Sequence, residues 1–334
     1  MWTVGRDMVV VAASSGGVEP LRVLLGELPA DLPAALFVVL HVTPDDSGAL
    51  PGLLDRSGPL KVVPAEDRQP VEHGHVYVAR PDHHLLVHDG MTRLSRGPLH
   101  NGHRPAADPL FMSAALDAGR RVAAVVLSGA LDDGAKGSQA VDHHGGAVAV
   151  QDPQEAGFPG MPQAAVAAVA NAIVLPVREL AGWIVRQSRT PVIAEEQVDD
   201  AGVAVELARF LGDEPTSEVP AGEFAGHSCP ECGGPMYEQK SGTASRFVCR
   251  LGHAWTGDRM IDAQADAVER ALWVTIQRLE DRLRLLDRMR HSAGDRGREI
   301  PARRFGEEAE RTREALGTIR VLQSRIGRDP ILRS

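Results

Sequence analysis

The sequence predicts a doubly wound α/β domain, a mostly parallel sheet with helices on both faces. Apolar runs of the length of buried strands recur over residues 1–190, and segments with helical periodicity separate them. The first run, Met8–Ala13, stops at Ser14-Ser15-Gly16-Gly17 and leads directly into a helical segment. In open α/β sheets, ligands bind at the carboxyl ends of strands, beside helix N-termini that attract anions. We therefore expect the functional site at the turn that begins with Ser14.

The elements after this turn continue the alternation. One apolar helical face predicts the first helix, and its members are Val18, Leu21, Leu25 and Leu28. Further strands are expected at Ala35–Leu40, Val62–Val63, His75–Ala79, His84–His88, Met91–Leu94, Val122–Leu127, Ala147–Val150 and Ile173–Leu175. Further helices are expected over Asp108–Ala118, after Gly134, from Pro162 and up to Arg186. Turn residues between short apolar runs predict a small antiparallel excursion from His75 to Leu94.

Composition indicates a globular protein of two or three domains. The chain has 334 residues, of which 43% are hydrophobic and 24% charged. Its formal net charge of −9 argues against a general nucleic-acid binder and leaves a local basic patch open. No apolar run approaches the ~20 residues of a membrane span, and the short N-terminal run is needed for the first strand rather than for a signal peptide. A cytoplasmic location without membrane insertion is expected.

The character of the chain changes after residue 190. Residues 191–226 are predicted to form an acidic linker, with one short helix around Val203–Leu211. Residues 227–258 are predicted to form a small zinc-ribbon-like module, because they contain all three cysteines. Residues 259–327 carry apolar stripes at helical spacing, broken by glycines and a proline, which predicts a helical hairpin. These stripes need cover, from a second copy, from a partner or from the rest of the chain.

The cysteines have the spacing of paired zinc ligands. Cys229 and Cys232 make one pair, and Cys249 and His253 make the other. Three thiolates and one imidazole complete a closed tetrahedral site, so the predicted zinc is structural and no cofactor is expected for catalysis. The alternative is three free thiols and an ordinary histidine. A nucleic-acid-binding ribbon is also left open by the aromatic and basic residues nearby, which are Arg246, Phe247, Arg250 and Trp255.

Three predicted strand ends carry residues that suit catalysis: Ser14, His41 and Asp133. A serine nucleophile needs a base that takes its proton and a carboxylate that orients the base. Each residue also has a simpler interpretation. Ser14 could belong to a phosphate-binding turn, although neither dedicated nucleotide motif occurs there. His41 could be an ordinary buried histidine, and Asp133 a turn residue before Gly134.

With these motifs in place, the sequence resembles the chemotaxis protein-glutamate methylesterases, the CheB type. The resemblance extends from Met8 to Arg186. It rests on seven stretches in the order of that family, which are Ala13–Gly17, Val38–His41, Ala79–Val87, His103–Phe111, Leu127–Ala135, Gln151–Pro153 and Gly160–Pro162.

The resemblance implies a Ser-His-Asp hydrolase that removes methyl groups, as methanol, from glutamyl methyl esters on chemoreceptor helices. By motif position, Ser14 would be the nucleophile, His41 the base and Asp133 the orienting acid. The backbone N–H groups of Ser15 and Ala130 would stabilise the oxyanion. A second activity, deamidation of protein glutamine, is left open.

Two stretches depart from the family pattern. Ser128–Leu131 stands where Thr-Gly-Met-Gly is usual, and Val42–Ser47 replaces Met-Pro-x-x-Phe-Thr after the histidine. Both changes affect the predicted substrate more than the predicted reaction. Many family members also carry an N-terminal receiver domain, whereas the first catalytic strand here begins near Met8. We therefore expect a stand-alone form with a C-terminal zinc-ribbon and helical extension.

Two hypotheses that assign the protein to other functional classes stay open. One is a signalling or scaffolding protein whose esterase domain is catalytically weak. The other is a zinc-ribbon regulator that binds nucleic acid, which the net charge disfavours. Under the preferred reading the partners are methylated receptor helices, together with a second copy or another protein at the C-terminal helices.

Overall fold

The computed structural model describes residues 3–193, 200–211, 219–241 and 244–326. The chain forms two compact units. One comprises Met1–Gly226 and Gly234–Trp255, and the other comprises His227–Gly233 and Thr256–Ser334. Each unit is described by itself. Within the described residues, no helix is both long and apolar enough to cross a membrane.

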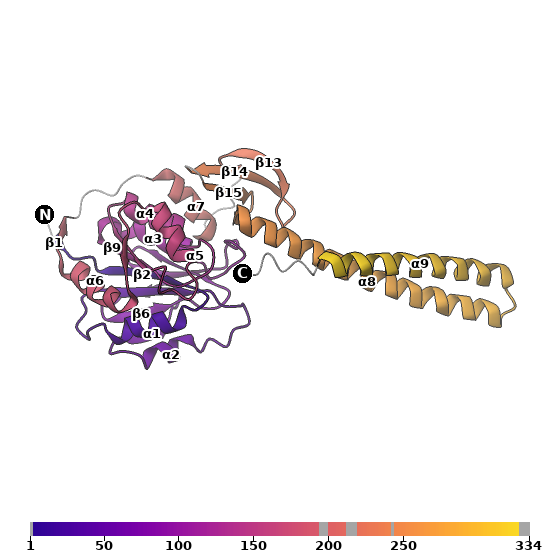
Figure 1. The fold of residues 1–334 in the computed structure, drawn as a ribbon, viewed down its shortest axis with the longest axis horizontal. Helices are drawn as coiled ribbons and strands as arrows, with labels where there is room; N and C mark the ends of the chain where they lie inside the picture. Colours follow the sequence, from indigo (N-terminus) through magenta and orange to yellow (C-terminus); the bar gives the residue numbers. More distant parts are fainter. Residues whose placement is uncertain (1–2, 194–199, 212–218, 242–243, 327–334) are drawn as a thin grey trace. The chain divides into compact units, whose positions relative to one another are not determined.

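A seven-stranded sheet forms the centre of the first unit (Figure 1). Its order is β11-β10-β9-β2-β3-β6-β4, and every pairing in it is parallel. The strands are β2 (Met8–Ala13), β3 (Ala35–Leu40), β4 (Lys61–Pro64), β6 (His75–Val78), β9 (Val122–Val126), β10 (Ala147–Gln151) and β11 (Ile173–Leu175). All residues of β2, β3 and β9 are buried, as expected for strands covered on both faces. The predicted parallel α/β fold is confirmed.

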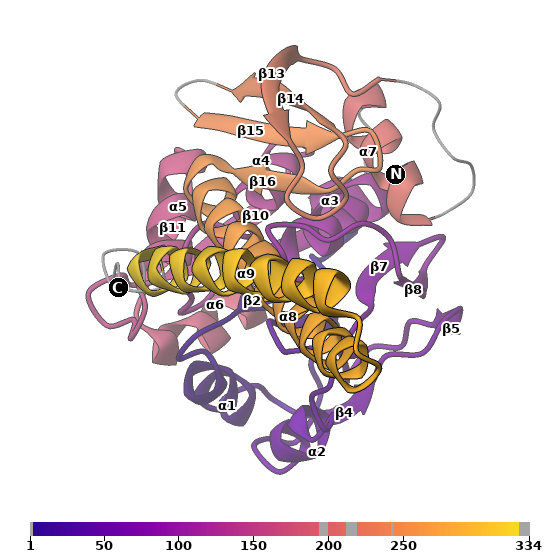
Figure 2. The same cartoon turned by 90° about the vertical axis from the view of Figure 1, so that its right-hand side faces the viewer.

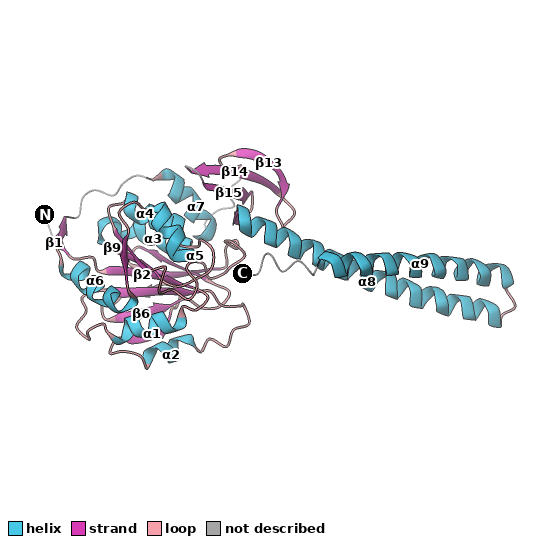
Figure 3. Ribbon diagram, in the orientation of Figure 1, coloured by secondary structure: helices cyan, strands magenta, loops and turns pink. Residues whose placement is uncertain are grey.

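Helices cover both faces of this sheet (Figure 3). Because side chains alternate along a strand, Val9 and Val11 of β2 enter one apolar cluster while Val10 and Ala12 enter another. The first cluster includes side chains of α1 (Val18–Gly26), α2 (Leu50–Asp55) and α6 (Val177–Arg189). The second includes side chains of α3 (Ala107–Ala118), α4 (Ala135–His143) and α5 (Gly160–Ala168).

The antiparallel excursion is present and differs from the prediction in one of its three strands. It contains β5 (Gln69–Pro70), β8 (Met91–Ser95) and β7 (His84–His88), paired in that order. The expectation that His75–Ala79 belongs to it is wrong, since β6 lies between β3 and β4 in the parallel sheet. The buried Val76, Tyr77 and Val78 explain this placement, because a strand buried on both faces fits the central sheet. An additional pair joins β1 (Thr3–Val4) to β12 (Val192–Ile193).

Two further elements of this unit follow residue 199. Helix α7 (Ala201–Leu211) contributes the buried Leu207 and Phe210 to the cluster of α3. A small four-stranded sheet follows, in the order β13 (Glu223–Ser228), β14 (Pro235–Ser241), β15 (Ala244–Cys249) and β16 (Ala254–Thr256), with β14 and β15 antiparallel (Figure 2). Residue 254 of β16 also bridges to His100. The linker helix and the small sheet are thus packed parts of the α/β unit.

The second unit contains a hairpin of two long helices. Helices α8 (Gly257–Asp295) and α9 (Glu299–Ile326) have 39 and 28 residues and are joined by a tight turn at Gly297. The apolar contact between them is made by buried residues, which are Ile276, Leu286, Ala293, Ala309 and Leu316. Ion pairs between the helices flank this contact, among them Arg282–Glu308, Arg313–Asp287 and Arg320–Glu280. The predicted C-terminal helices are present.

Candidate active site

Ser14 lies in the turn between β2 and α1, at the carboxyl edge of the sheet. Its backbone N–H donates to the Ser128 carbonyl at 3.0 Å, and its own carbonyl accepts from the Gly17 N–H at 2.9 Å. Gly16 has a φ of 70°, a conformation that glycine adopts at low cost and that the sharp turn requires. Ser14 is half-buried, whereas Ser15 and Gly16 are exposed. The turn therefore presents a hydroxyl at the place where α/β sheets bind ligands.

His41 and Asp133 form a short hydrogen-bonded pair beside this turn. His41 Nε2 lies 2.6 Å from Asp133 Oδ2, and the two side chains are 7% and 3% exposed. The backbone N–H of His41 donates to the backbone carbonyl of Ala13, the residue before Ser14, at 3.2 Å. A carboxylate only accepts hydrogen bonds, so Nε2 carries the proton and Nδ1 is left with a free lone pair. The pair thus has the form of a base and its orienting acid.

The imidazole of His41 also stacks on a second histidine. The rings of His41 and His103 lie 4.1 Å apart at an angle of 11°. His103 belongs to the family-like stretch His103–Phe111, and no individual role for it was expected from the sequence. Its ring covers one face of the His41 ring and so limits the rotation of His41.

Asp133 is held ionised by the start of α3. Its carboxylate accepts from the N–H groups of Ala107 at 2.6 Å, Asp108 at 3.1 Å and Gly134 at 3.0 Å. Burial alone would raise the pKa of Asp133, but the hydrogen bond from His41, the electrostatic interactions with the His41 and His100 rings, and the backbone donor of Ala107 hold that pKa well below its usual range. The helix N-terminus favours the same negative charge.

Asp108 is a second buried carboxyl group, and its role was not expected from the sequence. Its Oδ1 accepts from the N–H groups of Gly134 at 3.0 Å and Gly137 at 2.7 Å. Burial and the neighbouring charge of Asp133 raise the pKa of Asp108 to about 8. A signal was available, because the acidic residue stands before a proline in the first turn of a predicted helix.

The turn after β9 lies against Ser14. The Ser128 hydroxyl donates to the Ser15 carbonyl at 2.9 Å and accepts from the Phe158 N–H at 3.0 Å, so it ties three segments together. A side chain at Gly129 would place its Cβ 2.0 Å from Met161 Sδ and 3.0 Å from the Ser14 Cβ. Ala130 follows directly. The two predicted oxyanion donors, Ser15 and Ala130, thus belong to two turns that are in contact.

A cavity of about 350 Å³ opens beside Val42, the residue after His41, and its lining does not include Ser14, His41 or Asp133. It is lined by Val42, Asp46, Ser47, Gly48, Leu50, Pro51, Pro64, Ala79, Arg80, Pro81 and His83. The lining includes three residues of Val42–Ser47, one of the two stretches that depart from the family pattern. Substrate specificity is therefore expected to depend on this segment.

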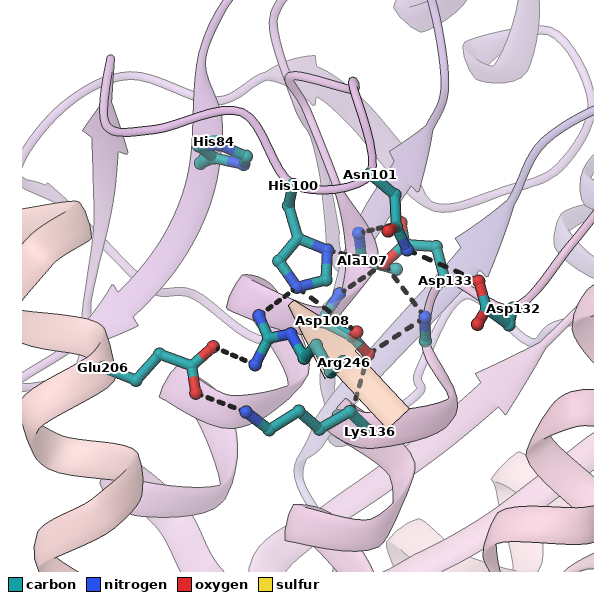
Figure 4. A network of polar contacts seen from close by, with 12 residues as sticks. His84, His100, Asn101, Ala107, Asp108, Asp132, Asp133, Lys136, Glu206 and Arg246 are labelled. Atoms are coloured by element: carbon teal, nitrogen blue, oxygen red, sulfur yellow. Dashed lines mark hydrogen bonds and ion pairs between the residues drawn. The ribbon is translucent and has the colours of Figure 1, made fainter. Parts of the chain in front are cut away.

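Next to Asp133 lies a polar network that the sequence did not reveal (Figure 4). It contains His100, Asp108, Lys136, Glu206 and Arg246, which come from five segments of the chain. Arg246 was considered above for a nucleic-acid surface. Its side chain is only 13% exposed and is paired with Glu206, so it is not part of a basic surface.

The predicted metal ligands lie in two turns. In the first, Cys229 is buried, Cys232 is exposed, and the Cys229 carbonyl accepts from the Gly233 N–H at 2.9 Å. In the second, Cys249 Sγ lies 3.5 Å from His253 Nδ1, and the Cys249 carbonyl accepts from the Gly252 N–H at 2.9 Å. Both glycines have positive φ. Each turn thus holds two of the four predicted ligands.

Comparisons with known proteins agree with the first unit. Residues 9–184, more than half of the chain, match the CheB methylesterase family. The protein-glutamate methylesterase/protein-glutamine glutaminase 2 of Anaeromyxobacter dehalogenans is 38% identical over 174 residues, which cover 52% of this chain and 51% of that protein. The putative protein-glutamate methylesterase/protein-glutamine glutaminase of Leptospira interrogans is 31% identical over 181 residues, which cover 54% of this chain and 94% of that protein.

A solved structure is similar as well. The catalytic domain of the Thermotoga maritima CheB methylesterase aligns with a TM-score of 0.52 and 32% identity, over 54% of this chain and 97% of that domain. The chain spans about half the length of most of the curated relatives it matches, including the Anaeromyxobacter protein. The match covers the α/β unit up to α6 and leaves out α7, the small sheet and the hairpin.

Proposed function

The chain belongs to the CheB methylesterase family, and from this premise we propose that it hydrolyses glutamyl methyl esters of proteins. The observation that carries the proposal is the 2.6 Å pair of His41 and Asp133 beside the Ser14 turn. The two relatives compared above are named as protein-glutamate methylesterases. The reaction is a carboxylic ester hydrolysis that needs no cofactor.

In the proposed mechanism, Ser14 Oγ attacks the ester carbonyl carbon while His41 Nδ1 takes the hydroxyl proton. The oxyanion of the tetrahedral intermediate accepts hydrogen bonds from the backbone N–H groups of Ser15 and Ala130. The intermediate expels methoxide, which receives the proton from His41 and leaves as methanol. Water, deprotonated by His41, then cleaves the acyl-Ser14 ester and releases the glutamate side chain, while His41 returns the proton to Ser14 Oγ.

Asp133 supports this proton transfer electrostatically. Its low pKa keeps it ionised, so it stabilises the imidazolium that forms when His41 accepts the proton. Because Nε2 is committed to Asp133, the imidazole keeps the tautomer in which Nδ1 is the base.

We propose methylated chemoreceptor helices as the substrate, and with them a role in chemotaxis signalling, as the resemblance to the chemotaxis methylesterases implies. The cavity beside Val42 suits one side-chain ester presented by such a helix, because it joins apolar walls at Val42 and Leu50 to the polar Arg80 and His83. The relatives' names also include protein-glutamine glutaminase. The same acyl-enzyme would form from a glutamine amide with loss of ammonia, so deamidation is a second proposed activity.

We also propose one structural zinc ion, held by Cys229, Cys232, Cys249 and His253. The support is the spacing of the four residues, the two glycine-containing turns and the 3.5 Å approach of Cys249 and His253. Four protein ligands leave no open position for water, so the ion would stabilise the fold and take no part in ester chemistry. Elemental analysis of protein purified without chelators should find one zinc per chain, and its absence would refute the site.

The esterase proposal is tested by methanol release from methylated receptor fragments. The wild-type protein should release methanol, and Ser14→Ala should lower kcat by roughly 10⁴-fold, the loss typical of a triad residue. Ser15→Ala is the matched control, because its proposed contribution is a backbone N–H that alanine keeps. An active Ser14→Ala variant beside an inactive Ser15→Ala variant would show that the nucleophile is misassigned.

A further inference from the structure

A guanidinium from the small C-terminal sheet reaches the candidate active site. Arg246 lies on β15, and its Nη2 is 2.6 Å from the Nε2 of His100, a residue 146 positions earlier in the chain. Its Nη1 lies 2.6 Å from Glu206 Oε1 on α7. The side chains converge in Figure 4, with Arg246 between Glu206 and His100. The family match ends before both Glu206 and Arg246.

The contact with Arg246 determines the protonation of His100. A guanidinium has donors and no acceptor, so His100 Nε2 must accept and the proton must sit on Nδ1. Burial, and then the charge of Arg246, lower the pKa of His100 to about 3, which agrees with a neutral ring. The protonated Nδ1 lies 3.7 Å from Asp133 Oδ1, which is an electrostatic contact longer than a hydrogen bond. His100 therefore stands between Arg246 and the acid that orients His41.

The charges of this buried cluster balance only when Arg246 is included. Glu206 also pairs with Lys136 on α4. Burial alone would raise the pKa of Glu206, but Arg246 and Lys136 hold that pKa well below its usual range. With His100 and Asp108 neutral, the two carboxylates Asp133 and Glu206 are matched by the two cations. An unpaired buried charge is costly, so loss of one cation would drive a proton onto a carboxyl group.

We propose that Arg246 is a positioning residue for the esterase. Through His100, it keeps Asp133 charged and aligned on His41, so that β15 of the small sheet forms part of the catalytic machinery. This inference rests on the proposed function. It also assigns a role to the segment beyond the family match: the small sheet and α7 complete the support of the triad acid.

The main test compares the pH dependence of kcat/KM for a small methyl ester. Arg246→Met removes a cation, so the carboxyl groups keep their protons to higher pH. The acid limb of the kcat/KM profile should therefore move to higher pH by about one pH unit. Glu206→Gln removes an anion, so the acid limb should move to lower pH. The charged and titratable groups that face the Asp108–Asp133 pair, and contribute to this limb, are His41, His84, His100, Lys136, Glu206 and Arg246.

Arg246→Met should also lower kcat by about 10- to 100-fold, while KM stays unchanged. A loss of this size is typical when a residue that holds another active-site residue in place is removed. Arg246→Lys keeps the charge and should return the acid limb to its wild-type position. Lys240→Met removes a cation from the exposed part of the same sheet and serves as the control.

A purely structural ion pair would lower the melting temperature of both variants without opposite shifts of the acid limb, and that outcome would overturn the proposal. If Arg246→Met does not fold, the downward shift in Glu206→Gln and the unshifted limb of Arg246→Lys decide the matter. If the wild-type protein hydrolyses no methyl ester, the proposed function fails. The role of Arg246 is then read from the downfield proton resonance of the His41–Asp133 hydrogen bond, which should shift in Arg246→Met and not in Lys240→Met.

Discussion

At the scale of residues, two neighbouring carboxyl groups have opposite protonation because their donors differ. Asp133 accepts from an imidazole and three backbone N–H groups, whereas Asp108 accepts from two backbone N–H groups and faces the charge of Asp133. The result is one carboxylate with a depressed pKa beside a carboxyl with a pKa of about 8. Environment, and not residue type, assigns the roles.

The raised pKa of Asp108 predicts a stability that depends on pH. The neutral acid is favoured in the folded state, so its contribution is complete below the unfolded pKa of ~3.9 and is lost as pH rises through about 8. Asp108→Asn cannot ionise. The free energy of unfolding of this variant, relative to that of the wild type, should therefore be larger at pH 9 than at pH 5, by on the order of 1 kcal/mol or more. Thermal unfolding at both pH values measures this, with the exposed Asp89→Asn as control. An equal difference at pH 5 and pH 9 would contradict it.

Ser128 provides a second prediction at this scale. Its hydroxyl joins the Ser15 carbonyl to the Phe158 N–H, and Ser128→Ala leaves both backbone groups without that partner. We expect a loss of about 1–3 kcal/mol in the free energy of unfolding and a lower kcat, because the turn that carries Ser14 and Ser15 loosens. Ser128→Thr keeps a hydroxyl and should retain most of both quantities. Wild-type values in Ser128→Ala would show that the hydroxyl does not hold the turn.

At the scale of elements, two strand-to-helix turns pack so closely that one position excludes any side chain. The turn after β9 lies on the turn after β2, joined by the bond from the Ser14 N–H to the Ser128 carbonyl. Gly129 is the point of contact with Ser14 and Met161. Close packing transmits small displacements, so the distance between these turns controls the position of the nucleophile.

Gly129→Ala should therefore abolish most ester turnover. The new methyl group would lie 2.0 Å from Met161 Sδ and 3.0 Å from the Ser14 Cβ, so the Met161 side chain or the Ser14 turn must move. We expect kcat to fall by about 100-fold or more, because displacements near 1 Å at a reacting group carry such losses. The matched control is Gly52→Ala in α2, where an added Cβ meets nothing within 4 Å. Turnover measured on both variants decides the matter, and an active Gly129→Ala enzyme would show that this contact is soft.

At the scale of the whole molecule, the small sheet connects the proposed metal ligands to the esterase. Arg246 and Cys249 lie on the same strand, β15, and their side chains serve the proposed triad support and the proposed zinc site. Metal binding of this kind contributes directly to folding free energy. The order of β15, and with it the position of Arg246, is therefore expected to depend on the metal.

Chelation of the metal should lower ester turnover to about the level of Arg246→Met, although the ion has no place in the chemistry. The chelator should have little further effect on the Arg246→Met variant, because the link is already broken there. Restored turnover after zinc is added back checks that the loss is reversible. Full turnover in protein shown by elemental analysis to be metal-free would mean that the esterase is independent of this sheet.

The helical hairpin leads to a separate prediction about association. It exposes large apolar side chains, among them Trp273, Val274, Leu285, Met289, Val321 and Leu322. Apolar surface is stabilised when it leaves water, and we propose that a second copy covers these side chains. Trp273→Gln with Leu285→Gln should lower the molar mass measured by light scattering and leave turnover of a small methyl ester unchanged. A monomeric wild-type protein would exclude the second copy and leave another partner as the candidate.

The sequence alone determined the parallel α/β core and the candidate triad, because both depend on local patterns. Continuous apolar runs predict strands buried on both faces, and such strands end where Ser14, His41 and Asp133 stand. Only the tertiary structure placed β6 inside the sheet and brought Arg246, Glu206 and His100 next to Asp133. A buried charge is stable only when its partners surround it, and here those partners come from distant segments that no periodicity connects.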